Sequence, residues 1–444
     1  MPSLTIPIEG LATRLFARLD ARLCHDRATP VALALSGGGD SMALLALATD
    51  WARSRGRPLL ALTVDHGLNA DSTAWTLRAG RAARRMGADW RALAWTGDKP
   101  ATGLPAAARA ARHALIADAA RQADARVVLF AHTADDGAEG DWMRARGSTL
   151  GHLAEWSPSP AWPQGRGLML LRPLLDVRRE ALREVLRARG LDWIEDPANQ
   201  DLRFARSRAR VDLDPFLLPA EDAVPQGRMR VGRKALEGSS PLPAAEGWVA
   251  LTRDAPDRVV AAALVCAGGG DRPPRGERLC AVTDRLRASE DFTATLCGAR
   301  IVADGDKVIV AREPGEYARR PAPPLRLIPG QGVVWDGRFE IETAEDGWST
   351  VPAAGRLARL SRADRAMVAA LPQVVRGGLP VLLRDRATAP VLAGEGVRIQ
   401  SLVSQRLSLA LDQTTHERDL DHAIHGAMPT NALFSCEAFM TDVA

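Results

Sequence analysis

The chain has 444 residues, of which 46% are hydrophobic and 25% charged, and its formal net charge is +4. This length predicts two or three domains rather than one core. No stretch is apolar enough to span a membrane, no signal-peptide pattern is found, and the five cysteines form no Cys-x-x-Cys pair, so we expect a cytoplasmic protein with reduced thiols and neither zinc nor an iron–sulfur cluster.

The first informative element is a predicted strand, loop and helix over residues 31–47. An apolar run, Val31–Leu35, precedes Ser-Gly-Gly-Gly-Asp-Ser and a second apolar run of good helix formers. Glycines let the backbone turn tightly, and the start of the next helix adds unpaired amides, so a phosphate fits there. The candidate ATP-binding residues are Ser36, Gly37, Gly38, Gly39, Asp40 and Ser41.

This loop lacks the Gly-Lys-Ser/Thr of a Walker A motif and the glycine spacing of a dinucleotide-binding fingerprint. The order Ser-Gly-Gly-x-Asp-Ser after a strand resembles the pyrophosphate-binding loop (PP loop) of the N-type ATP pyrophosphatases, which split ATP into AMP and pyrophosphate. The alternative is an incidental glycine-rich turn in an α/β protein.

Three further strands are predicted over residues 59–64, 90–95 and 126–131, and they alternate with helices. This order predicts an α/β fold with a Rossmann-like parallel sheet and helices on both of its faces. Ligands of such sheets bind at the carboxyl ends of the strands. The side chains expected there, beside the glycine-rich loop, are His66, His132, Asp136 and Glu139.

Charged residues at this edge are candidates for catalysis. Asp40 and Asp136 are candidates to share a Mg²⁺ that bridges the phosphates of ATP. Arg109 and Arg112 lie three residues apart on a predicted helix, and one helix face would direct both toward phosphate. The alternatives are a solvated helix face for the arginines, a helix cap for the aspartate and a histidine, His132, satisfied by the backbone.

Arginines are dense in the next part of the chain, where an amphipathic helix is predicted over residues 177–189. A loop of Asp, Pro and Asn followed by spaced arginines is suited to contacts with a nucleic-acid backbone. The candidates for substrate or tRNA contact in this part are Arg144, Arg146, Asn199, Arg206 and Arg210.

Taken in order, the motifs of residues 28–212 resemble those of the tRNA(Ile)-lysidine synthetase family. The series is Ser36–Ser41, Val64–Leu68 with Ser72, Arg109-x-x-Arg112, His132-x-x-Asp135-Asp136-x-x-Glu139, Arg144-x-Arg146-Gly-Ser148, Arg172-Pro-Leu-Leu175, and Asp196-Pro-x-Asn199-x-Asp201 with Arg206 and Arg210. The whole superfamily shares the first motif, whereas the last three are more specific to this family. The resemblance implies an adenine nucleotide alpha hydrolase-like fold.

The resemblance also implies a reaction. ATP and Mg²⁺ would serve to adenylate the C2 oxygen of cytidine 34 in the CAU anticodon of an isoleucine tRNA, and the ε-amino group of free L-lysine would displace AMP to leave lysidine. Catalytic roles are implied for Asp40, Asp136, Arg109 and Arg112, and substrate or tRNA contacts for His66, His132, Glu139 and the candidates of the arginine-rich part. Because the attacking lysine must be neutral, Asp136 or Glu139 is expected to take its proton.

Linkers rich in proline and charge divide the rest of the chain. The expected domains are a catalytic domain at 1–214, a smaller α+β domain at 226–315, a β-rich domain at 325–412 and a loosely ordered tail at 413–444. The resemblance implies that the C-terminal domains hold the tRNA. The alternative is that they stabilise the catalytic domain or join two copies of it as a homodimer.

Two other functions stay open from the sequence. Another PP-loop enzyme is one, although thiolating relatives need cysteine pairs and glutamine-hydrolysing relatives need a nucleophile, for which Cys24 has no suitable context. A non-catalytic tRNA- or nucleotide-binding module with a decayed site is the other, and Gly137 and Gly140 beside Asp136 are its only support. An ATP–pyrophosphate assay separates an enzyme from such a module.

Overall fold

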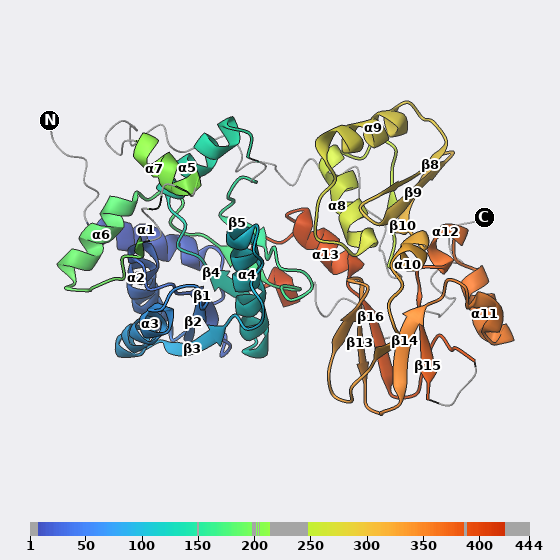
Figure 1. Ribbon diagram of the computed structural model, residues 1–444, viewed down its shortest axis with the longest axis horizontal. Coiled ribbons are helices and arrows are strands. Elements are labelled where there is room, and N and C mark those ends of the chain that lie inside the picture. Colours follow the sequence, from blue (N-terminus) through green and yellow to red (C-terminus); the bar gives the residue numbers. More distant parts are fainter. Residues whose placement is uncertain are drawn as a thin grey trace. The chain divides into compact units, whose positions relative to one another are not determined.

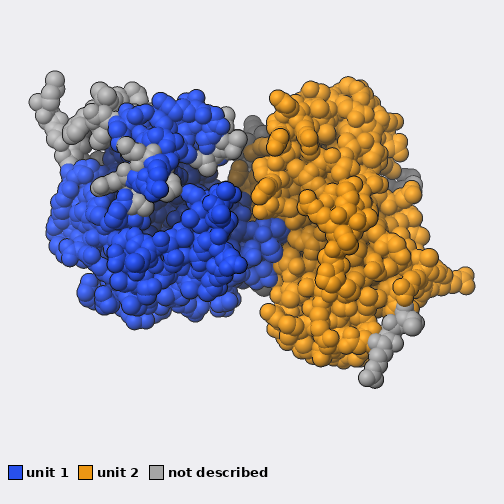
Figure 2. All heavy atoms as spheres, in the orientation of Figure 1, with its two compact units in different colours: residues 1–231, 414–420 blue, residues 232–413, 421–444 orange. Residues whose placement is uncertain are grey.

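The computed structural model describes residues 8–148, 151–197, 201, 203, 205–213, 247–385 and 389–421. The chain forms two compact units, residues 1–231 with 414–420 (unit 1) and residues 232–413 with 421–444 (unit 2), which Figure 2 colours separately. No helix in these described ranges is long and apolar enough to cross a lipid bilayer.

Unit 1 is an α/β structure built on one six-stranded sheet (Figure 1). Its strands are β1 (Val31–Ala34), β2 (Leu59–Asp65), β3 (Asp89–Ala94), β4 (Val127–Leu129), β5 (Trp156–Pro158) and β6 (Met169–Leu171). Its helices are α1 (Ile8–Asp20), α2 (Gly39–Arg55), α3 (Ser72–Met86), α4 (Leu104–Gln122), α5 (Ala134–Ala145), α6 (Arg179–Ala188) and α7 (Ala205–Asp212). The strand order is β3-β2-β1-β4-β6-β5, and only β5, at one edge, is antiparallel to its neighbour.

The sheet confirms the predicted Rossmann-like fold. Strands run outward from β1 to β2 and β3, and the chain then returns through α4 to β4 on the other side of β1. Because such crossovers are right-handed, α4 covers the face opposite to α2 and α3. The carboxyl ends of β1 and β4 therefore flank the point where the strand order reverses, which is where ligands bind in open α/β sheets.

Local sequence explains these elements. Helix α2 is apolar on nearly all sides, and it is buried along most of its length. Helix α4, which carries Arg109 and Arg112 as predicted, has Pro105 in its first turn, where a missing N–H costs no helical hydrogen bond. In α6, within the amphipathic helix predicted over residues 177–189, Leu182, Val185 and Leu186 are buried. Helix α1, which no motif marked, packs with α2.

In its described residues, unit 2 combines helices with three small antiparallel sheets. The strands are β7 (Val249–Leu251), β8 (Phe292–Leu296), β9 (Ala299–Asp304), β10 (Lys307–Arg312), β11 (Leu325–Arg326), β12 (Val333–Trp335), β13 (Phe339–Thr343), β14 (Trp348–Pro352), β15 (Pro380–Arg384) and β16 (Val397–Ser401). The helices are α8 (Asp257–Gly268), α9 (Gly276–Arg287), α10 (Gly315–Arg319), η3 (Leu357–Arg359), α11 (Arg362–Ala369), α12 (Gln373–Arg376) and α13 (Val403–Ala410).

The first sheet of unit 2 has the order β7-β10-β9-β8, and α8, α9 and α13 contribute to the apolar core beside it. The other sheets have the orders β11-β14-β15 and β12-β13-β16. These elements confirm smaller α+β and β-rich parts after the catalytic domain. The boundaries 226–315 and 325–412 between them stay a prediction.

The expectation of a loosely ordered tail from residue 413 is wrong for residues 414–420, which belong to unit 1. Glu417 and Arg57 are fully buried and form an ion pair with 2.7 Å between Oε1 and Nη2. The Cys24 N–H donates to Glu417 Oε2 at 2.8 Å. One buried carboxylate far along the chain gives no local sequence signal, because its partner lies 360 residues away.

Candidate active site

The PP loop lies between the carboxyl end of β1 and the start of α2, and its own hydroxyls brace it. Ser36 Oγ and Ser41 Oγ lie 3.0 Å apart, and Ser41 Oγ donates to the Gly38 carbonyl at 2.9 Å. Gly37 has a φ of +84°, and a Cβ there would lie 2.5 Å from Ile194 Cδ1. Only glycine meets both conditions, so the second loop position is fixed by backbone shape.

The amides at the start of α2 are available to a ligand. Gly38 is the N-cap residue and no side chain caps the helix there. A helix N-terminus that is not capped by its own side chains presents N–H groups and the positive end of its dipole, which favours phosphate. Asp40, in the first turn of this helix, places a carboxylate beside that position.

The second half of the edge is the start of α5. Thr133 is its N-cap: its backbone N–H and its Oγ1 both contact Asp136 Oδ2, at 2.9 and 3.0 Å. Thr133 Oγ1 also accepts from the Asp136 N–H, which completes a capping box. Gly137 and Gly140 follow inside an intact helix. The two glycines have therefore not unwound the helix that carries the aspartate.

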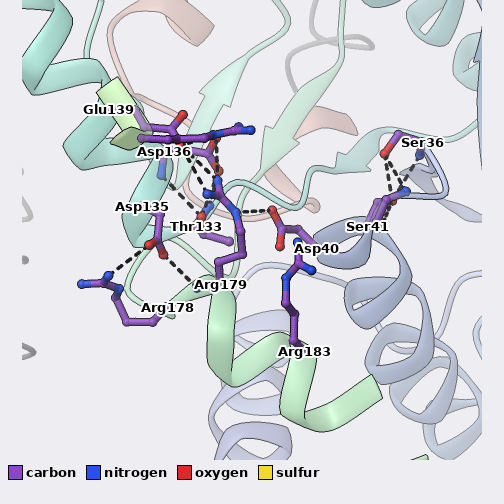
Figure 3. Close-up of polar contacts among 12 residues, drawn as sticks. Ser36, Asp40, Ser41, Thr133, Asp135, Asp136, Glu139, Arg178, Arg179 and Arg183 are labelled. Carbon is purple, nitrogen blue, oxygen red and sulfur yellow. Dashed lines mark hydrogen bonds and ion pairs between the residues drawn. The ribbon is translucent and has the colours of Figure 1, made fainter. Parts of the chain in front are cut away.

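Arg179, the first residue of α6, joins three carboxylates (Figure 3). Its Nε lies 3.1 Å from Asp40 Oδ2, its Nη2 lies 3.8 Å from Asp136 Oδ1 and its Nη1 lies 3.3 Å from Glu139 Oε1. Burial opposes its charge, but these carboxylates raise the pKa of Arg179 above its ordinary value. One guanidinium thus links α2, α5 and α6 at the edge of the sheet.

Asp135 holds the start of α6 in place. The Arg179 backbone N–H donates to Asp135 Oδ2 at 2.8 Å, and Arg178 Nη2 lies 3.1 Å from Asp135 Oδ1. The two neighbouring aspartates of α5 therefore divide their contacts: Asp135 binds the backbone of α6, and Asp136 faces the arginine side chain (Figure 3).

The pKa values of Asp40, in the PP loop, and Asp136, at the start of α5, are shifted in opposite directions. Burial raises the pKa of Asp40 above its ordinary value despite Arg179. Burial also opposes ionisation of Asp136, but Arg179, His132, the Thr133 N–H and Arg206 together hold its pKa below the ordinary value. Asp40 Oδ1 is buried without a hydrogen-bond partner in the described residues, and so is Glu139 Oε2. For these two oxygens, no hydrogen bond from the described residues offsets the free-energy cost of removal from water.

Further arginines surround this cluster. Arg210 Nε lies 2.7 Å from Glu139 Oε1 and Arg206 Nη1 lies 3.7 Å from Asp136 Oδ1. Burial, then repulsion from Arg109 and Arg206, lowers the pKa of Arg112 to about 10. The buried Arg112 Nε has no hydrogen-bond partner within the described part of the chain. The arrangement of Arg109, Arg112 and Arg206 leaves positive charge to be balanced by an anion.

His132 is held by one specific contact. Arg172 Nε donates to His132 Nδ1 at 3.2 Å, so the imidazole carries its proton on Nε2. Burial lowers the pKa of His132 to about 3, which makes it neutral at physiological pH. A neutral ring with a fixed tautomer presents an N–H donor to a ligand at this edge.

Comparison with known proteins decides the family. A PP-loop domain profile matches residues 11–217. A tRNA(Ile)-lysidine synthase of Caulobacter vibrioides is 47% identical over 406 residues, which cover 89% of this chain and 96% of that protein. The chain belongs to the tRNA(Ile)-lysidine synthase family.

Other members of the family are also similar. The tRNA(Ile)-lysidine synthase of Hyphomonas neptunium is 39% identical, with 70% of this chain and 89% of that protein covered. Among solved structures, a U34-tRNA thiolase from Methanococcus maripaludis matches with a TM-score of 0.38 and 18% identity, over 46% of this chain and 70% of that chain.

The structure brings most of the predicted site residues of this lysidine synthase family member to one edge. Asp40, Asp136, Glu139, Arg206 and Arg210 are linked through ion pairs. In the structure the side chains of Arg206 and Arg210 both pair with carboxylates of α5. Their contact with tRNA stays a prediction.

Three predicted residues have other surroundings. Arg144 pairs with Asp141 on its own helix, and Arg146 stacks on the Trp142 ring, 3.7 Å from its centroid. His66 directly follows β2, and its ring is nearly perpendicular to that of Trp95, with 6.0 Å between the ring centroids. Asn199 lies outside the described residues.

Sequence reasoning did not select Arg179, Arg172 or Thr133 as site residues of this family member. A signal for Arg179 existed, because Arg178 and Arg179 stand at the start of a helix, where the dipole disfavours cations. Arginines in that place need a compensating carboxylate. Asp135 pairs with Arg178, and Asp40, Asp136 and Glu139 surround Arg179.

Proposed function

We propose that this chain ligates lysine to C2 of cytidine 34 in the CAU anticodon of tRNA(Ile), with cleavage of ATP to AMP and pyrophosphate. The observation that carries the proposal is the 47% identity over 96% of the length of a tRNA(Ile)-lysidine synthase. The braced PP loop and the neighbouring carboxylates support ATP use by this chain itself.

Two bond-forming steps make up the reaction. The C2 oxygen of cytidine first attacks the α-phosphorus of ATP, and the bond to pyrophosphate breaks. The lysine nitrogen then attacks C2, and the C2–O bond to AMP breaks. Adenylation turns a poor leaving oxygen into a good one, and the site must align the amine with C2.

The residues that would hold ATP come from both sides of the strand reversal. The N–H groups at the start of α2 are suited to the β- and γ-phosphates, and Arg109 and Arg112 provide cationic groups for phosphate. His132 offers its Nε2–H as an uncharged donor to the charge that develops as pyrophosphate leaves, rather than to ATP before reaction. These groups are positioned before the substrate binds, which is how enzymes stabilise charge that develops during reaction.

Mg²⁺ is the divalent ion that fits the carboxylates near the phosphate position. No group of three or more His, Cys, Asp or Glu side chains suited to a metal occurs in the described ranges, but Mg²⁺ is commonly held by one or two carboxylates together with phosphate oxygens. Asp40, with its unpartnered Oδ1, and Asp136 form such a pair. Bound there, the ion supplies neutralisation of the phosphate charge as pyrophosphate leaves.

Lysine brings an ammonium group that needs a carboxylate before attack. Asp136 and Glu139 lie on the same helix, and Glu139 Oε2 is buried without a partner among the residues described. We assign the proton of the attacking amine to one of these two carboxylates.

A homodimer remains a prediction from the sequence, and light scattering at assay concentration checks it.

The test is incubation of the pure protein with ATP, Mg²⁺, labelled lysine and an isoleucine tRNA transcript with a CAU anticodon. A methionine tRNA, which shares that anticodon, is the matched control. Lysine in the first tRNA alone, with AMP released, is the expected result. AMP release without lysine transfer would keep ATP chemistry and overturn the lysine assignment, and absence of turnover would overturn both.

A further inference from the structure

Residues 414–420 reach the catalytic unit from the far end of the chain, and we call them the returning segment. Its main anchor is the fully buried pair of Glu417 and Arg57. Arg57 also donates through Nε to the Thr29 carbonyl at 2.8 Å, and through Nη1 to the Cys24 carbonyl. The segment is therefore bound by the loop that leads into β1.

A second set of contacts joins the returning segment to β5. Trp156 Nε1 donates to the Thr414 carbonyl at 2.9 Å, and Trp156 is buried. Arg22 reaches both sides, because its Nη1 donates to the Thr415 carbonyl at 2.8 Å and its Nη2 lies 3.6 Å from Glu155 Oε2. Within the described sheet β5 is an edge strand of three residues, paired only with β6. Its position thus depends on contacts from outside the sheet.

Strand β5 and the residues just before it hold Arg172. Arg172 Nη1 donates to the Ala154 carbonyl at 2.7 Å and to Ser157 Oγ at 2.9 Å, and its backbone N–H donates to the Glu155 carbonyl at 2.8 Å. The Nε of the same guanidinium is the donor that fixes the tautomer of His132. A planar guanidinium held through one nitrogen keeps the direction of the others.

We propose that the returning segment is a positioning element for His132: it holds Trp156 and β5, β5 holds Arg172, and Arg172 orients the imidazole. Residues 414–420 thereby connect a segment distant in sequence to a donor at the candidate active site. The proposal rests on the proposed function only for its kinetic readout. Its structural readout, the tautomer of His132, needs no substrate.

The experiment compares three full-length variants with the wild type. Trp156→Phe keeps an aromatic ring and removes the donor to the Thr414 carbonyl. Glu417→Gln removes the partner of Arg57. Arg418→Gln is the control, because its side chain is 68% exposed and its ion pair with Asp26 spans 3.8 Å. Circular dichroism checks that each variant is folded.

The expected result is a fall in kcat for Trp156→Phe of about two- to tenfold, the range for loss of one neutral hydrogen bond, with the KM for ATP within about twofold of wild type. In the ¹⁵N spectrum of histidine-labelled protein, the His132 Nδ1 signal moves from that of an unprotonated acceptor toward a mixture of tautomers. Glu417→Gln gives the same two changes, and Arg418→Gln gives neither.

An unchanged His132 signal in both Trp156→Phe and Glu417→Gln would overturn the proposal, as would equal falls in kcat for these variants and for Arg418→Gln. Failure of the proposed function is distinguishable, since it appears as absent lysidine formation in the wild type while the ¹⁵N comparison still reports on the returning segment.

Discussion

Replacing Arg179 by methionine removes a counter-ion shared by three carboxylates, of which Asp136 and Glu139 are buried, while it keeps an unbranched apolar stem. The guanidinium lies 3.1 Å from Asp40, 3.8 Å from Asp136 and 3.3 Å from Glu139, and its side chain is 20% exposed. Removing one partner of a buried ion pair costs about 3–5 kcal/mol. Because a fifth of the side chain remains in water, we expect the lower end, about 3 kcal/mol.

Thermal unfolding measures this loss. For a unit of this size, 1 kcal/mol lowers Tm by about 2–4 °C, so Arg179→Met should unfold about 6–12 °C below wild type. Arg187→Met is the matched control on the same helix, because its pair with Glu180 is 55% and 64% exposed. A pair of that kind contributes about 0–1 kcal/mol. Equal melting temperatures for the two variants would refute the assigned role of Arg179.

The difference should also depend on pH. Arg179 helps to lower the pKa of Asp136 from its ordinary 3.8, so this carboxylate contributes stability that is present above about pH 4 and is lost as the pH falls through the folded-state value. Arg179→Met lacks the stabilisation of ionised Asp136 by Arg179 at every pH. The gap between wild type and Arg179→Met should therefore be largest near neutral pH and narrow on acidification.

Four further predictions follow from the same edge of the sheet. Gly37→Ala, at a φ of +84°, should lower stability by about 1–3 kcal/mol and weaken ATP binding, whereas Gly137→Ala, with open space at Cβ in a helix, should be neutral or stabilising by about 1 kcal/mol in urea unfolding. Asp40→Ala should abolish AMP release yet leave tRNA affinity in filter binding within about twofold; full residual activity would remove its metal role. Burial lowers the pKa of His113 to about 3, so stability should fall from about pH 6.5 downward as the unfolded chain binds the proton, and His113→Phe should flatten that fall in pH-dependent unfolding. Arg206→Ala should weaken tRNA binding and lessen its salt dependence, and an unaltered slope would assign Arg206 to the carboxylate cluster alone.

Local patterns predicted the parts of the site that depend on neighbouring residues. The PP loop is one, because strand, glycines and helix follow one another and Gly37 requires its own φ. The start of α5 is another in part: the helix cap that the sequence offered as the alternative for Asp136 agrees with its capping box, although its partner Thr133 was not selected. In both places the chemistry is contained in a few consecutive residues, so its position in the fold follows from the strand that precedes it.

Contacts between distant segments could not be predicted in this way. Arg179 reaches Asp40 across 139 positions of the chain, and no periodicity encodes that approach. The ion pairs of Arg206 and Arg210 with α5 were not predicted, because the packing of α7 on α5 is not visible in the sequence. Glu417 is the extreme case. A charged side chain in a segment without a motif is expected to be exposed to solvent, and only the fold shows that it is buried against Arg57.

The returning segment has a consequence for synthesis of the protein on the ribosome. Residues 1–213 emerge first, but the unit they form includes Glu417, which is translated about two hundred positions later. Until then the Arg57 guanidinium lacks its carboxylate, and a buried charge without a partner keeps a nascent domain from reaching full stability. N-terminal domains usually fold as they are made. Here unit 1 is complete only after residues 414–420 have been translated, so a chain released before that point carries the PP loop without the contacts of the returning segment.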